Sequence, residues 1–119
     1  QALAWRINEA FLYAYEGNAR DAAKMYRDIM KRDTQSFRAD DAQSFIVEIL
    51  NEEPTKYILH LSLGYLSLIG SEDATTAREH FATFLKKCQD LNPQGLAEAR
   101  SLFPDAVMES AEAAATKQP

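Results

Sequence analysis

Residues 57–70 read YILHLSLGYLSLIG, and this stretch decides the fold. Apolar side chains occupy most of its positions, so a helix formed here has little polar face and is buried on several sides. We therefore expect a helix over about 54–69 at the centre of the molecule. Gly64 lowers the helix propensity by about 1 kcal/mol relative to Ala, which we interpret as a close crossing with another helix.

Helical periodicity continues on both sides of this segment. Apolar residues recur at three- and four-residue steps over about 3–16, 18–33, 37–51, 71–90 and 92–103, and again after Pro104 over 105–114. Gly17 suits the end of a helix, Asn18 suits the cap of the next one, and Asn92-Pro93 suits a helix start. In the third segment we expect one apolar face to be turned to the core, and it consists of Ala42, Phe45, Ile46, Ile49 and Leu50.

The composition agrees with a helical chain. The 119 residues are 46% apolar and 26% charged, and they include only four glycines and four prolines. This is a typical balance for one soluble domain with few helix breakers. We expect a single all-α domain of about six helices over residues 1–114 and a frayed tail over residues 115–119.

The net charge of −5 argues against nucleic-acid binding, because an acidic domain repels phosphate backbones. The basic pairs Lys31-Arg32 and Lys86-Lys87 lie near the ends of expected helices, where cations suit the helix dipole. The apolar stretch 57–70 is shorter than the ~20 residues that span a bilayer, so we expect no membrane insertion. The lone Cys88 fits a cytoplasmic setting, although a signal or anchor upstream of Gln1 would lie outside this sequence.

We expect no enzymatic activity, metal or cofactor. His60 lies on the most apolar helix, where a core or interface histidine is the ordinary case. His80 has no second ligand one turn away, and Cys88 takes the place of a small core residue. The acidic pairs Asp40-Asp41 and Glu52-Glu53 are neighbours that point apart on a helix. The sequence also contains no Gly-rich phosphate loop and no G-x-S-x-G motif.

Two segments share a glycine turn followed by a small residue and, four positions later, an aromatic residue. They are Gly17 with Ala22-x-x-x-Tyr26, and Gly70 with Ala77-x-x-x-Phe81. The pattern resembles the tetratricopeptide repeat (TPR), in which the small residue lets paired helices approach and the aromatic one fills the space between pairs. The resemblance implies a right-handed superhelix of TPR-like helical hairpins.

The first hairpin matches the repeat best, since Ala10, Tyr13 and Gly17 stand where a small, an aromatic and a turn residue are usual. It departs at Asn8-Glu9, where a large aliphatic residue is usual, and at Asp33-Thr34, where the closing proline is missing.

The second hairpin leaves its register open, because either Ser62 or Gly64 could be the small residue of its first helix. The two motifs begin at Ala22 and Ala77, and this separation is not a multiple of the 34-residue TPR period. The segment 37–51 is therefore interpreted as an inserted helix.

The resemblance also implies a concave face that binds a protein or peptide segment. The candidate residues are Asn8, Phe11 and Tyr15 on the first helix, with Lys56 and His60 on the fourth. The TPR clamp for a C-terminal carboxylate is largely absent, because apolar residues replace most of its polar ones. We therefore expect an apolar or amphipathic partner anchored on Phe11 and Tyr15. In the alternative interpretation these two aromatic residues belong to the core.

A second hypothesis is self-assembly. Leu3, Trp5 and Ile7 open the first helix with no preceding helix to cover them. An uncapped apolar face at the end of a helical array tends to bind a copy of itself. The domain would then be a homo-oligomerisation module of a larger protein, with a homodimer formed through the first helix.

Overall fold

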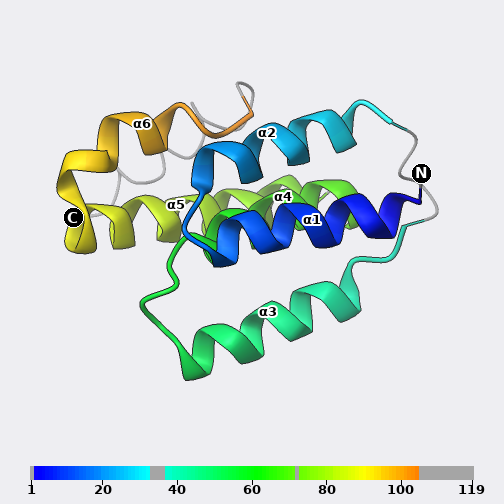
Figure 1. The fold of residues 1–119 in the computed structure, drawn as a ribbon, viewed down its shortest axis with the longest axis horizontal. Coiled ribbons are helices and arrows are strands. Elements are labelled where there is room, and N and C mark those ends of the chain that lie inside the picture. Colours follow the sequence, from blue (N-terminus) through cyan, green and yellow to red (C-terminus); the bar gives the residue numbers. More distant parts are fainter. Residues whose placement is uncertain (1, 33–36, 72, 105–119) are drawn as a thin grey trace.

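The computed structural model describes residues 2–32, 37–71 and 73–104 (Figure 1). Within these ranges every regular element is a helix, which confirms the all-α class. The elements are α1 (Leu3–Tyr15), α2 (Ala19–Met30), α3 (Asp40–Glu52), α4 (Leu59–Ser71), α5 (Ala74–Leu91), a 3₁₀ turn η1 (Pro93–Gly95) and α6 (Leu96–Arg100). The expected helix over 105–114, the tail over 115–119 and the TPR departure at 33–34 lie outside the described residues.

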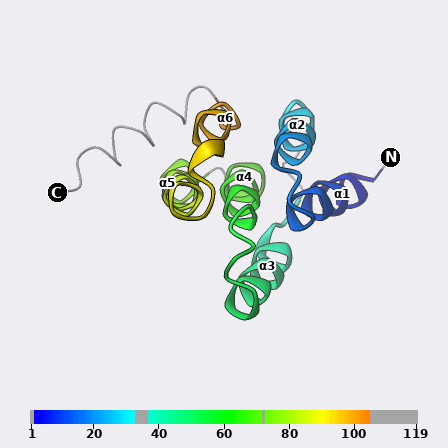
Figure 2. The same ribbon diagram turned by 60° about the vertical axis from the view of Figure 1, so that its left-hand side comes forward.

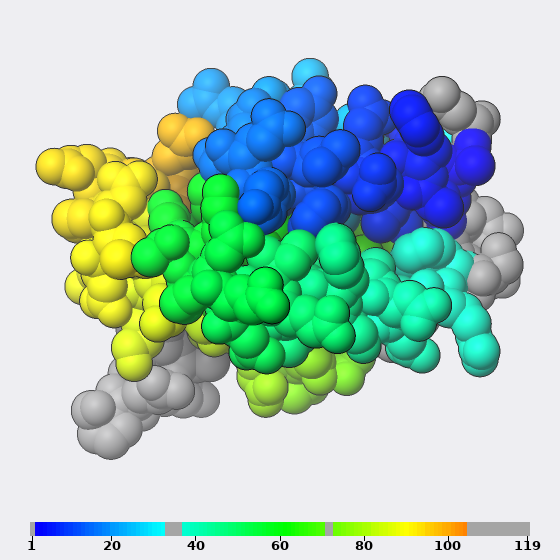
Figure 3. All heavy atoms as spheres, turned by 60° about the horizontal axis from the view of Figure 1, so that its bottom comes forward, coloured from blue at the N-terminus to red at the C-terminus, as the bar shows by residue number. Residues whose placement is uncertain are grey.

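Two antiparallel hairpins, α1 with α2 and α4 with α5, form the body of the molecule (Figure 2). Helix α4 contacts α1, α2, α3 and α5, so its predicted central position is confirmed. Helices α2 and α3 lie on opposite sides of α1 and α4 (Figures 1 and 2). On the side where α3 lies, the surfaces of α1 and α3 are adjacent (Figure 3).

Helix ends follow the local signals in the sequence in most places. Gly17 has a φ of 91°, the left-handed conformation expected after α1. The Asn18 side chain accepts a hydrogen bond from the Asp21 N–H and so caps α2. At the start of α5 the Asp73 carboxylate accepts a hydrogen bond from the Thr76 N–H.

Two expected boundaries are wrong. Helix α4 begins at Leu59 and not near residue 54, because residues 54–58 form turns closed by hydrogen bonds to the carbonyl three residues earlier. Helix α6 ends at Arg100, and the chain then turns so that Leu102 and Phe103 enter the core. The Arg27 guanidinium holds this turn by donating to the carbonyls of Ser101 and Phe103 at 2.6 and 2.9 Å.

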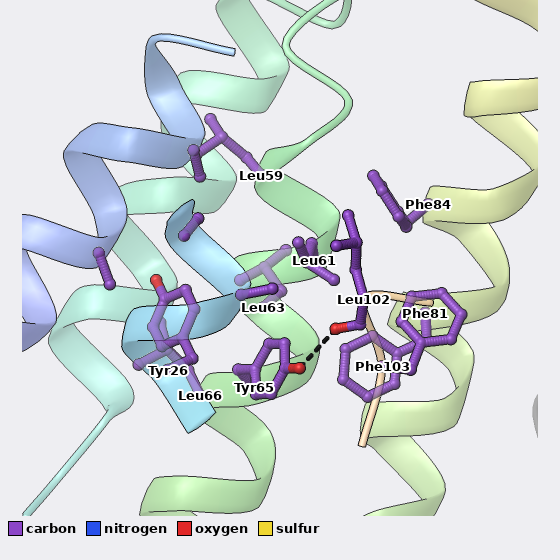
Figure 4. Packing of buried hydrophobic residues seen from close by; sticks show 14 of the residues in the cluster. Tyr26, Leu59, Leu61, Leu63, Tyr65, Leu66, Phe81, Phe84, Leu102 and Phe103 are labelled. Carbon is purple, nitrogen blue, oxygen red and sulfur yellow. Dashed lines mark hydrogen bonds between the residues drawn. The ribbon is translucent and has the colours of Figure 1, made fainter. Parts of the chain in front are cut away.

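A row of aromatic rings joins the two hairpins through α4 (Figure 4). Ring centroids are separated by 5.2 Å between Tyr26 and Tyr65, 5.4 Å between Tyr65 and Phe81, and 4.7 Å between Phe81 and Phe103. The Tyr65 hydroxyl donates to the carbonyl of Leu102 at 2.5 Å. The core therefore includes the segment after α6 as well as the two hairpins.

A small residue on α4 gives room to one of these rings. A Cβ atom at Gly64 would overlap with the ring of Phe81 on α5, so the expected close helix crossing is confirmed. Ser62 is fully buried two residues before Gly64, on the other side of α4, and its hydroxyl has no hydrogen-bond partner among the described residues. Of the two candidates for the small residue that faces α5, the structure therefore selects Gly64.

Candidate partner-binding face

Three aromatic rings form a continuous row from α1 to α3. Phe11 lies between Tyr15, at 6.0 Å between ring centroids, and Phe45, at 5.6 Å. Phe11 and Tyr15 are half-buried, whereas Phe45 is 54% exposed. The row thus begins beside the core and ends in solvent.

Helix α3 lies against α4 and presents Phe45 toward α1. Ile46 is the buried residue of α3, and the Gln43 side-chain amide donates to the Ser67 hydroxyl of α4 at 3.3 Å. With Ile46 buried on a helix, its neighbour Phe45 points about 100° away from it. The expectation that both residues face the core is therefore wrong for Phe45.

Tyr15 fixes the linker between α3 and α4 to the end of α1. Its hydroxyl donates to the Glu53 carboxylate at 3.2 Å, and this hydrogen bond together with the negative charge raises the pKa of Tyr15. The Lys56 ammonium donates to the Tyr15 carbonyl at 3.1 Å and lies 4.3 Å from the centre of the ring. Tyr15 and Lys56 are therefore already engaged within the domain.

Two more apolar side chains extend this surface along α1. Trp5 is 58% exposed and Leu12 is 43% exposed. They are seven residues apart, which places them on one side of the helix, with the exposed Asn8 between them. We call the surface made by Trp5, Asn8, Phe11, Leu12, Tyr15 and Phe45 the α1–α3 face.

The face is bordered by acidic side chains on α3. Glu48 and Glu52 follow Phe45 by three and seven residues and therefore lie on the same side of the helix. Asp41 precedes Phe45 by four residues and lies there as well. All three carboxylates are exposed.

The structure brings together some of the five residues predicted for partner binding. Phe11, Tyr15 and Lys56 meet at one end of the α1–α3 face, and Asn8 lies one turn before Phe11. His60 lies elsewhere, on the part of α4 that is packed near His80 and Lys87 of α5. Burial, and then the positive charges of these two groups, lower the pKa of His60 to about 4.

Sequence reasoning missed Phe45 and Leu12 as surface residues. Trp5 was assigned only to self-assembly. The available signal was the number of apolar residues on the third helix, since one helix packed along one side cannot bury them all. Phe45 and Val47 are the ones left exposed.

A cleft separate from the α1–α3 face lies where several helix ends meet. This open cleft has a volume of about 220 Å³ and is lined by the turn between α1 and α2, the start of α2, the residues just before α4, the second half of α5, and α6. The exposed Arg20 and Glu98 form an ion pair there at 3.3 Å. The buried Cys88 thiol donates to the Asn92 carbonyl at 3.4 Å and so has a hydrogen-bond partner.

Comparison with protein-family models, curated proteins and solved structures found no match to this chain. Among the residues that the structure describes, no three His, Cys, Asp or Glu side chains are grouped closely enough to hold a metal ion. None of the described helices combines the length and the hydropathy needed to cross a bilayer. Function is therefore inferred from the geometry of the α1–α3 face.

Proposed function

We propose that this domain is a non-catalytic scaffold that binds a segment of another protein on the α1–α3 face. The observation that carries the proposal is the exposure of Trp5 and Leu12 on α1 and of Phe45 on α3, where the Phe45 ring contacts the half-buried Phe11. Large aromatic side chains that stay in contact with water on one face are typical of protein–protein interfaces. Such residues anchor a partner because they bury much apolar area at low cost in side-chain entropy.

The TPR resemblance supports this proposal. Ala22 and Tyr26 of α2 and Ala77 and Phe81 of α5 are fully buried, as the repeat pattern implies. In a TPR-like array α1 and α4 are the first helices of their hairpins and line the concave face. Helix α3 packs against α4 and contacts α1 through the rings of Phe45 and Phe11. The inserted helix then takes part of that face, and the partner binds along α1 and α3.

The test is capture of partner proteins by the wild-type domain and by two variants of α3. Phe45→Ser removes the ring that links α1 to α3, and we expect partner binding to fall about tenfold or more, as for an interface hot spot. Val47→Ser is the matched control, because Val47 is also exposed, at 44%, but lies on the opposite side of α3. Circular dichroism melting confirms that both variants fold.

Loss of the same partners from both variants, or from neither, would contradict the proposal.

Self-assembly is the alternative function, and the observation that favours it is the 58% exposure of Trp5 at the start of α1. Light scattering over a range of concentrations separates the two. A scaffold for another protein stays monomeric, whereas a homo-oligomer gains mass with concentration and loses it with Trp5→Ser.

A further inference from the structure

We infer that the segment bound on the α1–α3 face is a basic amphipathic helix. This inference rests on the proposed function and adds the chemistry of the partner. Residues 39–55 contain five acidic residues and no Lys or Arg. Asp41, Glu48 and Glu52 border the aromatic row and form no ion pair with any other described residue. Their repulsion is relieved when a cationic partner binds.

Five of the thirteen basic residues of the chain lie on the opposite side, on or just after α2. Helix α2 and the two residues after it carry Arg20, Lys24, Arg27, Lys31 and Arg32 against only two acids. Since α2 and α3 lie on opposite sides of α1 and α4, these cations are too distant to neutralise the face (Figure 2). Lys56 lies at one end of the face, over the Tyr15 ring, and the exposed carboxylates of Asp41, Glu48 and Glu52 outnumber it. The α1–α3 face is therefore an apolar surface in a net negative field, and it selects partners by the sign of their charge.

The spacing of the anchors fits a helix. Trp5 and Leu12 are seven residues apart, about 10 Å along the axis of α1. A partner helix lying along α1 and α3 presents apolar residues at i, i+3 or i+4, and i+7 to Trp5, Leu12 and Phe45. Lys or Arg residues beside this stripe then lie over Glu48 and Glu52.

The described part of a second copy of this chain does not supply such a helix. Its basic helix α2 already buries its apolar side, which consists of Ala22, Ala23, Tyr26 and Ile29. The side of α2 that is available to another molecule is mostly polar, with Met30 as an exposed apolar residue at its end. A different protein with an unpaired basic amphipathic helix fits both requirements.

The experiment uses two synthetic helical peptides with identical Leu positions, one with Lys and one with Glu at the polar positions. The full 119-residue chain contains one tryptophan, so the emission of Trp5 reports occupation of the face directly. We expect the Lys peptide to shift this emission to shorter wavelength and to bind at least tenfold more tightly than the Glu peptide. Its affinity falls as salt is raised.

The variant Glu48→Gln/Glu52→Gln weakens binding of the Lys peptide about three- to tenfold, as expected for the loss of two exposed ion pairs. Glu79→Gln/Asp90→Asn is the matched control, because it removes the same charge from exposed positions of α5 and leaves binding unchanged. Equal affinity for both peptides, or equal effects of the two double variants, overturns the inference. A dimeric mass without peptide that Trp5→Ser abolishes also overturns it, because a second copy then covers the face.

Failure of the inference can be distinguished from failure of the proposed function. If capture of natural partners depends on Phe45 while the Lys peptide has no advantage, the scaffold stands and the basic partner is rejected. If capture of natural partners is independent of Phe45, the proposed function is rejected, regardless of the affinities measured for the two peptides.

Discussion

His60 is a titratable residue on an otherwise apolar helix, and its surroundings determine how stability depends on pH. Its Nδ1 atom is buried and has no hydrogen-bond partner among the described residues. Burial, with His80 and Lys87 nearby, lowers the pKa of His60 from 6.5 to about 4. The unfolded chain therefore binds a proton at a higher pH than the folded chain does. Stability is complete above the unfolded pKa and is lost as the pH falls from about 6.5 toward 4.

We predict that His60→Gln makes the decrease in melting temperature between pH 7 and pH 4 shallower than in the wild type. The reason is that glutamine keeps a polar side chain but cannot be protonated. Thermal melts at half-unit pH steps measure the two slopes. His80 also has a pKa lowered by burial, so part of the wild-type slope remains in the variant. Two identical slopes would show that His60 does not couple folding to pH.

At the scale of elements, the missing side chain of Gly64 sets the distance between α4 and α5. We predict that Gly64→Ala destabilises the domain by about 1–3 kcal/mol, because the added methyl group overlaps with the buried ring of Phe81. Alanine is the better helix former by about 1 kcal/mol, so helix propensity alone predicts the opposite sign. Urea unfolding measures the difference. Ser44→Ala, at an exposed position of α3, is the control and is neutral or slightly stabilising.

The attachment of α3 to the other helices is also decided at the scale of elements. Helix α3 is attached by Ile46, by the hydrogen bond from Gln43 to Ser67, and by the contact of Tyr15 with Glu53. Few contacts hold it compared with α4, whose side chains are buried on every side. This limited attachment leaves Phe45 and the acidic side chains available to a partner.

At the scale of the whole molecule, α4 makes the described helices one cooperative unit, because it contacts four of them. We predict that Leu61→Asp abolishes cooperative unfolding. Leu61 is fully buried, and an unpaired carboxylate there costs about 4–5 kcal/mol or more, against a typical total stability of about 5–15 kcal/mol. Leu12→Asp is the control, because Leu12 is 43% exposed and the variant keeps the fold. Near-ultraviolet circular dichroism during thermal melting checks both.

Several features could be predicted because they depend on local chemistry. The helical class, the turn at Gly17 and the cap at Asn18 follow from backbone preferences within a few residues. The central place of α4 follows from its composition, since a helix with apolar residues all round must be covered on several sides. The close crossing at Gly64 follows from the low helix propensity of glycine, because glycine in the middle of such a helix indicates that another helix lies close to it.

Other features required positions that are distant in the chain to be compared in space. The α4 start at Leu59 depends on the turns that place Lys56 against Tyr15. Periodicity predicts that Phe45 lies in the core. In the structure only one side of α3 is covered by other helices, and the buried residue on that side is Ile46.

The sequence by itself determined the secondary structure, the central helix and the net acidity, because these depend on the residues of one segment or on their sum. Only the tertiary structure decided which predicted binding residues share a face. It joined Phe11 and Tyr15 to Phe45, placed His60 beside α5, and separated the acidic α3 from the basic α2. The physical reason is that a shared surface depends on how helices pack, and the packing of α3 depends on contacts with α1 and α4 that no single segment encodes.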